Sequence, residues 1–398
     1  MEIDKPAIAG GEPVRQKPLR FGVPFIEREV IDAVVHVLET DWISTGPMTQ
    51  EFEGKVKSYV GAKNALALHS CTAGMELSLR VAGIGPGDEV ITTPMTFAAT
   101  SNVVIHCGAT PVFADINEHT LNIDPSQIER RITDKTRAIM PVHYAGQPCE
   151  MDEICDIARR HNLFIIEDAA HGLGAEYKGK KIGSIGDSTV FSFHVQKVIT
   201  TAEGGMVTTD NDDWARRMKV LSLHGMTKDA WGRATESRTH YEIVYPGYKY
   251  NMTDIQAVMA LPQMDRIEDY LKIRQNYAKI YTEAFREVPQ VEPLQRIDGI
   301  RHAENMYVIK LDLDHLKIDR DEFVEALKAE NIFPTVHYRT VHLQPYYRET
   351  YGYKRGDYPI AEDAADRVIT LPFSPKLSED DVRDVIKAVK RIATHFAC

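Results

Sequence analysis

The sequence predicts an α/β fold in which a mostly parallel sheet is covered by helices on both faces. From about Gly61 to Val207, short apolar runs of strand length alternate with runs of helical pattern. The strand-like runs are almost continuously apolar, which is typical of a parallel sheet buried on both sides. The pattern changes near residue 255, where a long helical stretch begins. We therefore expect a large α/β domain over residues 1–255, including an N-terminal arm, and a smaller α+β domain over residues 256–398.

The elements of the large domain follow one another in a regular order. A helical run separates most successive strand runs, as parallel neighbours in a sheet require. Gly83 closes the first helix, because glycine readily ends a helix in the left-handed conformation. Strands are expected at residues 64–70, 88–94, 110–116, 137–144 and 163–170, and helices at residues 72–83, 97–108 and 151–162.

The C-terminal part mixes helices with a short strand run. Residues 252–288 have the apolar spacing of a long helix, which we expect to kink or break near Pro262. Ser378 is the expected N-cap of the last helix. The other elements are a strand at residues 305–313 and helices at residues 319–331 and 378–396.

Composition and charge exclude several classes of protein. The chain has 398 residues, of which 43% are hydrophobic, and a formal net charge of −11. Such an acidic protein is a poor match for nucleic acid or an anionic membrane, although a local pocket can still bind a phosphorylated small molecule. The five cysteines contain no CxxC pair, so neither a disulfide framework nor a zinc site is expected. Without a signal peptide or an apolar run of about 18 residues, we expect a cytoplasmic protein.

One lysine lies in an unusual setting. Lys197 belongs to the stretch "FSFHVQKVITTAEGGMVTTD", which is rich in small, apolar and hydroxyl residues. Burying an unpaired ammonium is costly, so a lysine in such a place either has a partner or is neutral. Burial lowers the pKa of a lysine, and its neutral amine can then attack a carbonyl to form an imine.

An acidic residue ends a predicted buried strand. In "IIEDAAH", Asp168 falls at the carboxyl end of the strand, where open α/β sheets bind their ligands. In isolation it is better interpreted as a helix N-cap. A carboxylate there can also face a cationic nitrogen heterocycle, and His171 is close enough along the chain to face the same ligand.

Two further loops offer a phosphate site and a stacking surface. Thr72 and Ala73 lie between a strand and a helix, and the free N–H groups of a helix N-terminus bind anions. Phe97 follows a strand end, where its ring can stack on a planar ligand. Each feature alone is weak, since many loops have small residues and most phenylalanines belong to the core.

Together these features indicate one cofactor, pyridoxal 5′-phosphate. It needs a lysine for the imine, a carboxylate for the ring nitrogen, an anion site and a stacking face. The chain supplies them in loops beside predicted strands, at Thr72, Ala73, Phe97, Asp168, His171, Ser192 and Lys197.

The motifs resemble those of the DegT/DnrJ/StrS family of nucleotide-sugar aminotransferases. The resemblance extends from "WISTGPMTQEFE" to "LPFSPKLSEDDV", and the run FSFH-x-x-K-x-I-T-T-x-E-G-G is highly specific. The wording "CTAGM", "HYAG", "DAWGR" and "GYKYN" is most similar to the branch that makes UDP-4-amino-4-deoxy-L-arabinose. The resemblance implies fold type I, the aspartate aminotransferase-like fold of pyridoxal-phosphate-dependent transferases.

The resemblance also implies the roles of individual residues. Lys197 would form the Schiff base, Asp168 would pair with the ring nitrogen, and His171 would lie beside the ring hydroxyl. Phe97 would cover the ring, while the phosphate would be held by Thr72, Ala73 and Ser192. Family members form homodimers with shared active sites, in which the partner supplies a phosphate contact from a "GYNYR" motif. This chain has "GYKYN" instead, with Lys249 and Asn251 at the variable positions.

The implied activity is transfer of the amino group of L-glutamate to a ketosugar nucleotide, with 2-oxoglutarate as by-product and without a metal. A UDP-linked 4-keto sugar and a product for surface polysaccharide are the expected specifics. His143, Tyr144 and His194 are candidate substrate contacts, although loop structure explains them nearly as well. Two alternatives remain: another pyridoxal-phosphate reaction on a sugar nucleotide, such as 3-keto amination or dehydration, and a non-catalytic regulatory protein of the same fold.

Overall fold

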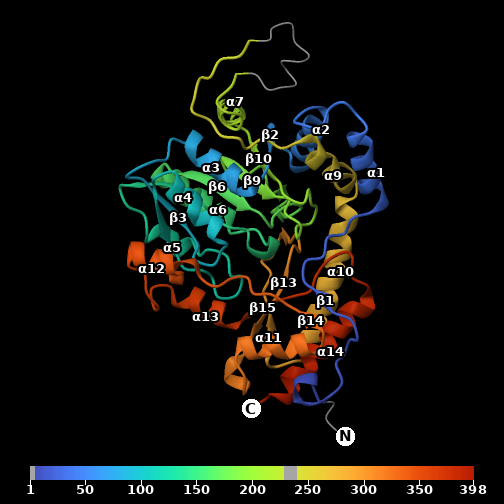
Figure 1. Cartoon of the computed structure of the whole chain (residues 1–398). Helices are drawn as coiled ribbons and strands as arrows, with labels where there is room; N and C mark the ends of the chain where they lie inside the picture. Colours follow the sequence, from blue (N-terminus) through green and yellow to red (C-terminus); the bar gives the residue numbers. More distant parts are fainter. Residues whose placement is uncertain (1–4, 228–239) are drawn as a thin grey trace.

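The computed structural model describes residues 5–227 and 240–398 (Figure 1). The "DAWGR" wording at residues 229–233 lies outside the described residues. Within the described ranges, none of the helices combines the length and apolar character needed to cross a lipid bilayer.

The centre of the large domain is a seven-stranded sheet with the order β2-β10-β9-β6-β5-β3-β4. Its neighbouring strands are parallel, except that β10 runs antiparallel to both β2 and β9. The predicted mostly parallel sheet is therefore confirmed. The strands are β2 (Asn64–Leu68), β3 (Glu89–Thr92), β4 (Thr110–Phe113), β5 (Thr136–Ile139), β6 (Phe164–Ala169), β9 (Ser188–Ser192) and β10 (Gly205–Thr209).

Helices cover both faces of this sheet (Figure 1). Successive residues of a strand point to opposite faces, so Val90 packs into one apolar cluster and Ile91 into another. One face is covered by α3 (Cys71–Val81), α4 (Ala98–His106) and α7 (Asp212–Leu221). The other is covered by α1 (Arg28–Leu38), α2 (Pro47–Val60), α5 (Pro125–Glu129), α6 (Met151–His161) and α9 (Asp254–Asp265).

The helical stretch is interrupted near Pro262, as predicted, but at Arg266 and not at the proline itself. Pro262 lies inside α9, which continues to Asp265, and the next helix, α10 (Ile267–Phe285), begins after Arg266. The interruption thus comes where the backbone of Arg266 leaves the helical region, with φ −113° and ψ 9°. The proline is accommodated within a helix whose buried face packs on α1 and α2.

A second apolar core lies in the C-terminal part. There α10, α11 (Arg320–Ala329) and α14 (Glu379–His395) pack around a sheet ordered β11-β13-β15. Ser378 caps α14 as expected, with its hydroxyl accepting a hydrogen bond from Asp381 N. The remaining elements are α12 (Pro345–Tyr351), α13 (Pro359–Arg367), β11 (Val291–Pro293), β13 (Tyr307–Leu311), β15 (Val368–Leu371), and the short strands β7 (Glu176–Tyr177), β8 (Lys180–Lys181) and β12 (Ile300–Arg301).

The N-terminal segment packs against this second core. Strand β1 (Leu19–Arg20) pairs in parallel with β14 (Ile332–Phe333). The buried Glu330 carboxylate accepts hydrogen bonds from Ala7 N at 2.8 Å and Val14 N at 2.7 Å. The division of the chain at residue 255 stays a prediction, since α9 packs with the large domain and α10 contributes to both cores.

Candidate active site

Asp168 lies near the carboxyl end of β6 and is only 4% exposed. Its Oδ2 accepts a hydrogen bond from Thr100 Oγ1 at 2.7 Å, and its Oδ1 accepts one from Ala170 N at 3.1 Å. Burial raises the pKa of this carboxyl group, while those two hydrogen bonds and the charge of Lys197 lower it. Among the described residues no basic side chain forms an ion pair with it. The carboxylate is thus anchored and is left to balance a positive charge on a ligand.

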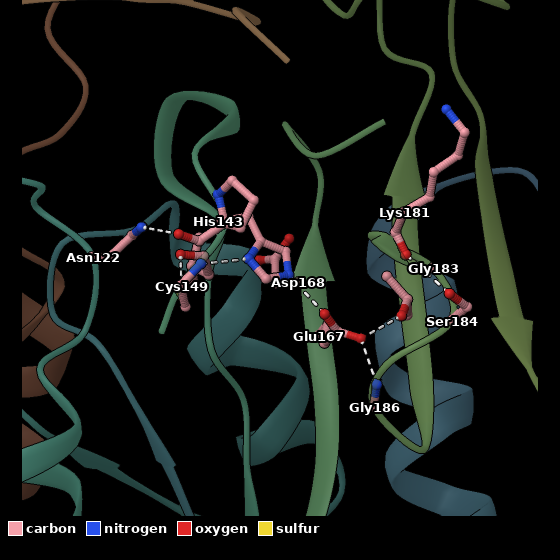
Figure 2. A network of polar contacts seen from close by, with 12 residues as sticks. Asn122, His143, Cys149, Glu167, Asp168, Lys181, Gly183, Ser184 and Gly186 are labelled. Carbon is pink, nitrogen blue, oxygen red and sulfur yellow. Dashed lines mark hydrogen bonds and ion pairs between the residues drawn. The ribbon is translucent and has the colours of Figure 1, made fainter. Parts of the chain in front are cut away.

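A separate polar network lies behind Asp168 (Figure 2). The side chain of Glu167 points to the opposite face of β6 and is fully buried. Its Oε1 accepts hydrogen bonds from Gly186 N at 2.8 Å and Thr189 Oγ1 at 2.6 Å, and its Oε2 is 2.8 Å from His143 Nε2. This network fixes the strand that carries Asp168.

The three candidate substrate residues occupy different environments. His143 is fully buried, and its Nδ1 accepts a hydrogen bond from Cys149 N, so Nε2 carries the proton donated to Glu167. Tyr144 is also buried, and its hydroxyl donates to the carbonyl of His337. Neither side chain is free to meet a substrate in this structure. His194 is half-exposed and remains a candidate.

Lys197 lies in the loop that follows β9, with its backbone N–H donating to His194 O at 3.0 Å. The residue is half-buried, but its amine is held in the interior. Burial lowers the pKa of the amine to about 8, and the nearby Cys71 and Asp168 partly offset this effect. A substantial fraction of the amine is therefore neutral near pH 8, as imine formation requires.

This pKa predicts the pH dependence of cofactor capture. At pH 7 about 10% of an amine with this pKa is neutral, compared with less than about 0.1% of an ordinary lysine. We expect the rate of covalent capture of pyridoxal phosphate by the cofactor-free enzyme to rise with pH, with a midpoint near 8, because only the neutral amine reacts. Stopped-flow absorbance would measure it, with a blocked free lysine as the control. A midpoint near 10 would contradict the lowered pKa.

The predicted phosphate residues are brought together by a close backbone contact. Ser70 caps α3, and its hydroxyl accepts a hydrogen bond from Ala73 N at 3.1 Å. A Cβ atom on Gly205 would lie only 2.3 Å from the carbonyl carbon of Ser70, so β10 starts directly against the helix N-terminus. Ser192 is the cross-strand partner of Gly205. The N-terminal turn of α3, with Thr72 and Ala73, therefore lies beside Ser192 and is a candidate anion cradle.

His171 and Phe97 lie beside a residue that the sequence did not single out. His171 is 5% exposed, and its Nδ1 has no hydrogen-bond partner among the described residues. The Phe97 ring is 64% exposed, and its centroid lies 6.3 Å from that of Tyr338. The Tyr338 hydroxyl is 3.3 Å from His171 Nε2. Tyr338 comes from the C-terminal part of the chain and shows no local motif that could have identified it.

The N-terminal segment contributes a wall near Lys197, which the sequence also did not reveal. Gly22 has φ +68°, which favours glycine, and a Cβ atom there would lie 2.6 Å from Gln196 Cγ. A narrow cavity is lined here by Gly22, Gln196, Lys197 and Arg274, among others. The N-terminal segment and the C-terminal part therefore both line this cavity beside the lysine loop.

The "GYKYN" segment runs along the edge of its own sheet. Lys249 is exposed, whereas Asn251 is half-buried and donates a hydrogen bond to Thr45 Oγ1 at 2.6 Å. His69 N donates to Tyr250 O at 2.8 Å and fixes the segment beside β2. The segment thus holds Asn251 against its own chain and leaves Lys249 exposed.

The observed groups fit pyridoxal phosphate. Among the described residues, Asp168 is a buried carboxylate that forms no ion pair, and His171 has a buried nitrogen without a hydrogen-bond partner. Phe97 presents an exposed ring, and the α3 N-terminus is a candidate anion cradle. Within residues 5–227 and 240–398 no cluster of three His, Cys, Asp or Glu side chains could hold a metal ion. The fold and the site together define a fold type I pyridoxal-phosphate enzyme.

The comparison with known proteins agrees. The chain belongs to the DegT/DnrJ/EryC1/StrS aminotransferase family, which matches residues 24–390. It is 48% identical to the spore coat polysaccharide biosynthesis protein SpsC of Bacillus subtilis, over 94% of this chain and 97% of that protein. It is 41% identical to UDP-4-amino-4-deoxy-L-arabinose–oxoglutarate aminotransferase of Shewanella sediminis, over 93% of this chain and 96% of that protein.

Among solved structures, Spr1654 of Streptococcus pneumoniae in its PLP form is similar over 95% of this chain and 99% of that protein. The TM-score is 0.89 and the identity 34%. The protein is therefore a pyridoxal-phosphate-dependent sugar aminotransferase, as its motifs implied.

Proposed function

We propose that this enzyme transfers the amino group of L-glutamate to a ketosugar nucleotide, a UDP-linked 4-keto sugar, to make an amino sugar for surface polysaccharide. The observation that carries this proposal is the interior amine of Lys197, with a pKa of about 8, close to the buried carboxylate of Asp168. Similarity to SpsC and to the arabinose aminotransferase supports the sugar substrate and the glycan product. The free state of all five cysteines supports a cytoplasmic location.

Each residue of this site has a separate role in the reaction. When bound, pyridoxal phosphate supplies an electron sink for the carbon that loses its proton. Lys197 would hold the cofactor and, once free, would take up and return that proton as general base and acid. Asp168 would keep the ring nitrogen protonated by its charge, while the α3 N-terminus and Ser192 would hold the phosphate.

A panel of ketosugar nucleotides with L-glutamate tests this function. UDP-linked and TDP-linked 3-keto and 4-keto sugars would be supplied separately, and products identified by mass and NMR. Formation of an amino sugar together with one 2-oxoglutarate from the UDP-linked 4-keto sugar supports the proposal, whereas the same products from a 3-keto sugar alone would establish 3-keto amination. Loss of water from the sugar without 2-oxoglutarate would instead establish dehydration. No turnover of any sugar by cofactor-loaded enzyme would favour the regulatory alternative.

We also propose that two chains form a homodimer with shared active sites. On α1, Ile31, Val35 and Leu38 are each about half exposed and lie on one face of the helix. Such a contiguous apolar surface is unusual for a monomer. Lys249 is exposed at the edge of the sheet. Its side chain can reach the phosphate site of a neighbouring chain. Ile243, in the segment just before Lys249, is exposed as well.

Mixed dimers test this arrangement. A chain carrying Lys197→Ala and a chain carrying Lys249→Ala should recover activity when refolded together, up to about half of the wild-type activity per heterodimer. One site of each heterodimer then lacks both Lys197 and Lys249, and the other site has both lysines. The Lys249→Ala homodimer must first prove strongly impaired, which its own kcat/KM measures. If it is impaired and proven heterodimers stay inactive, Lys249 does not serve the neighbouring site.

A further inference from the structure

We propose that Tyr338 is a positioning residue: it donates a hydrogen bond to Nε2 of His171 and so keeps the imidazole proton on Nδ1, facing the ring oxygen of the cofactor. The inference rests on the proposed place of His171 beside the cofactor ring. It assigns a role to a tyrosine that lies outside every motif identified in the sequence.

The geometry of the two rings brings their polar atoms within hydrogen-bond distance. The Tyr338 hydroxyl is 3.3 Å from His171 Nε2. The ring planes differ by only 8° and their centroids are 6.4 Å apart, so the rings are nearly parallel and offset. The hydroxyl therefore lies at the Nε2 edge of the imidazole, within reach of its lone pair.

The protonation states leave a single proton to place on the imidazole. Burial lowers the pKa of His171 well below its ordinary value, and the charges of Lys197, His337 and His302 act in the same direction. Burial and the nearby Asp168 raise the pKa of Tyr338. At neutral pH the histidine is therefore a neutral imidazole with one N–H, and the tyrosine keeps its O–H.

The direction of the hydrogen bond follows from the other partners. Within the described ranges, the Tyr338 hydroxyl has no hydrogen-bond partner other than His171 Nε2. If Nε2 carried the proton, the tyrosine O–H would be left without an acceptor, which is costly in the interior. Donation by Tyr338 places the histidine proton on Nδ1, the buried nitrogen that has no partner in the protein. The ring oxygen of pyridoxal phosphate is a suitable acceptor for that proton.

Packing holds the Tyr338 ring in this orientation. The rings of Phe97 and Tyr144 lie on other sides of it, each with its centroid 6.3 Å away. Tyr338 follows β14 of the C-terminal part, whereas His171 follows β6 of the central sheet. The hydrogen bond therefore joins the second part of the chain to the cofactor site of the first.

Nitrogen-15 NMR of the cofactor-free enzyme tests the tautomer without any substrate. We expect His171 of the wild type to carry its proton on Nδ1, and Tyr338→Phe to shift the population toward Nε2–H. Tyr346→Phe, which changes an exposed tyrosine, should have no effect. A wild type with the proton on Nε2 would overturn the proposal, and this measurement needs no variant to fold.

The cofactor-loaded enzyme gives an independent readout. A donor on Nδ1 stabilises the anionic ring oxygen, so Tyr338→Phe should move the pH midpoint of the visible absorption band by about one unit. The same change in a His171→Ala background should produce no further shift. An equal shift in both backgrounds would show that Tyr338 acts independently of His171 and would overturn the proposal. Neither result depends on which sugar the enzyme accepts.

Discussion

Replacing Lys197 with alanine is expected to lower transamination by at least about 10⁴-fold while the protein stays folded and still binds pyridoxal phosphate without a covalent bond. The variant loses both the amine that attaches the cofactor and the base that moves the proton. The cradle at the α3 N-terminus and the Asp168 carboxylate remain in place, so binding should survive. Turnover with glutamate and a ketosugar nucleotide measures the loss.

Two controls make this result specific. Lys197→Arg keeps a positive charge but cannot form an imine, because a guanidinium does not lose its proton. This variant should therefore be as inactive as Lys197→Ala. Lys181→Ala changes another half-buried lysine and should keep normal turnover. Borohydride should fix the cofactor to the wild type at Lys197 alone. Labelling of a different lysine would refute the assignment.

The second large effect is expected for Asp168→Asn. Its kcat should fall by about 10²–10³-fold, because an amide cannot hold the ring proton by charge. The amide oxygen can still accept a hydrogen bond, from Thr100 or from Ala170 N, so we expect the protein to fold. Steady-state kinetics and thermal unfolding would be measured together. Nearly normal turnover would exclude the proposed pairing with the ring nitrogen.

Glu167→Gln is the matched control, since it alters the neighbouring carboxylate of the same strand. Glu167 accepts three hydrogen bonds in the interior. The NH2 group of the introduced glutamine would face at least one of these three donors, and that hydrogen bond would be lost. We expect a loss of about 1–3 kcal/mol in the free energy of unfolding, with a smaller effect on kcat than that of Asp168→Asn. The two variants thus separate stability from chemistry.

The sheet could be predicted from the sequence because the signal is local and repeated. Apolar strand runs separated by helical runs leave few other ways to bury both faces, and the structure has strands at each expected place. Asp168 was singled out by the same logic, since it lies at a strand end, where parallel sheets bind ligands. Lys197 was singled out instead by its setting among small, apolar and hydroxyl residues.

Other features depend on contacts that no local pattern records. Tyr338 reaches the site from the C-terminal part of the chain, so nothing in its own neighbourhood links it to His171. The interior position of His143 depends on Glu167 and Cys149, which surround it only after folding. The break after α9 falls at Arg266 instead of Pro262, because packing on α1 and α2 holds the proline turn within the helix.

The alternation of side chains along β6 has a consequence for protein engineering. Glu167 faces the polar network that fixes the strand, while Asp168, one residue later, faces the site. The two faces can therefore be varied as separate sets in a mutant library. Libraries that spare Glu167 and its partners should retain a high fraction of folded variants, even when positions on the Asp168 side of the sheet are randomised. The scaffold is accordingly a favourable starting point for evolving aminotransferases with new substrates.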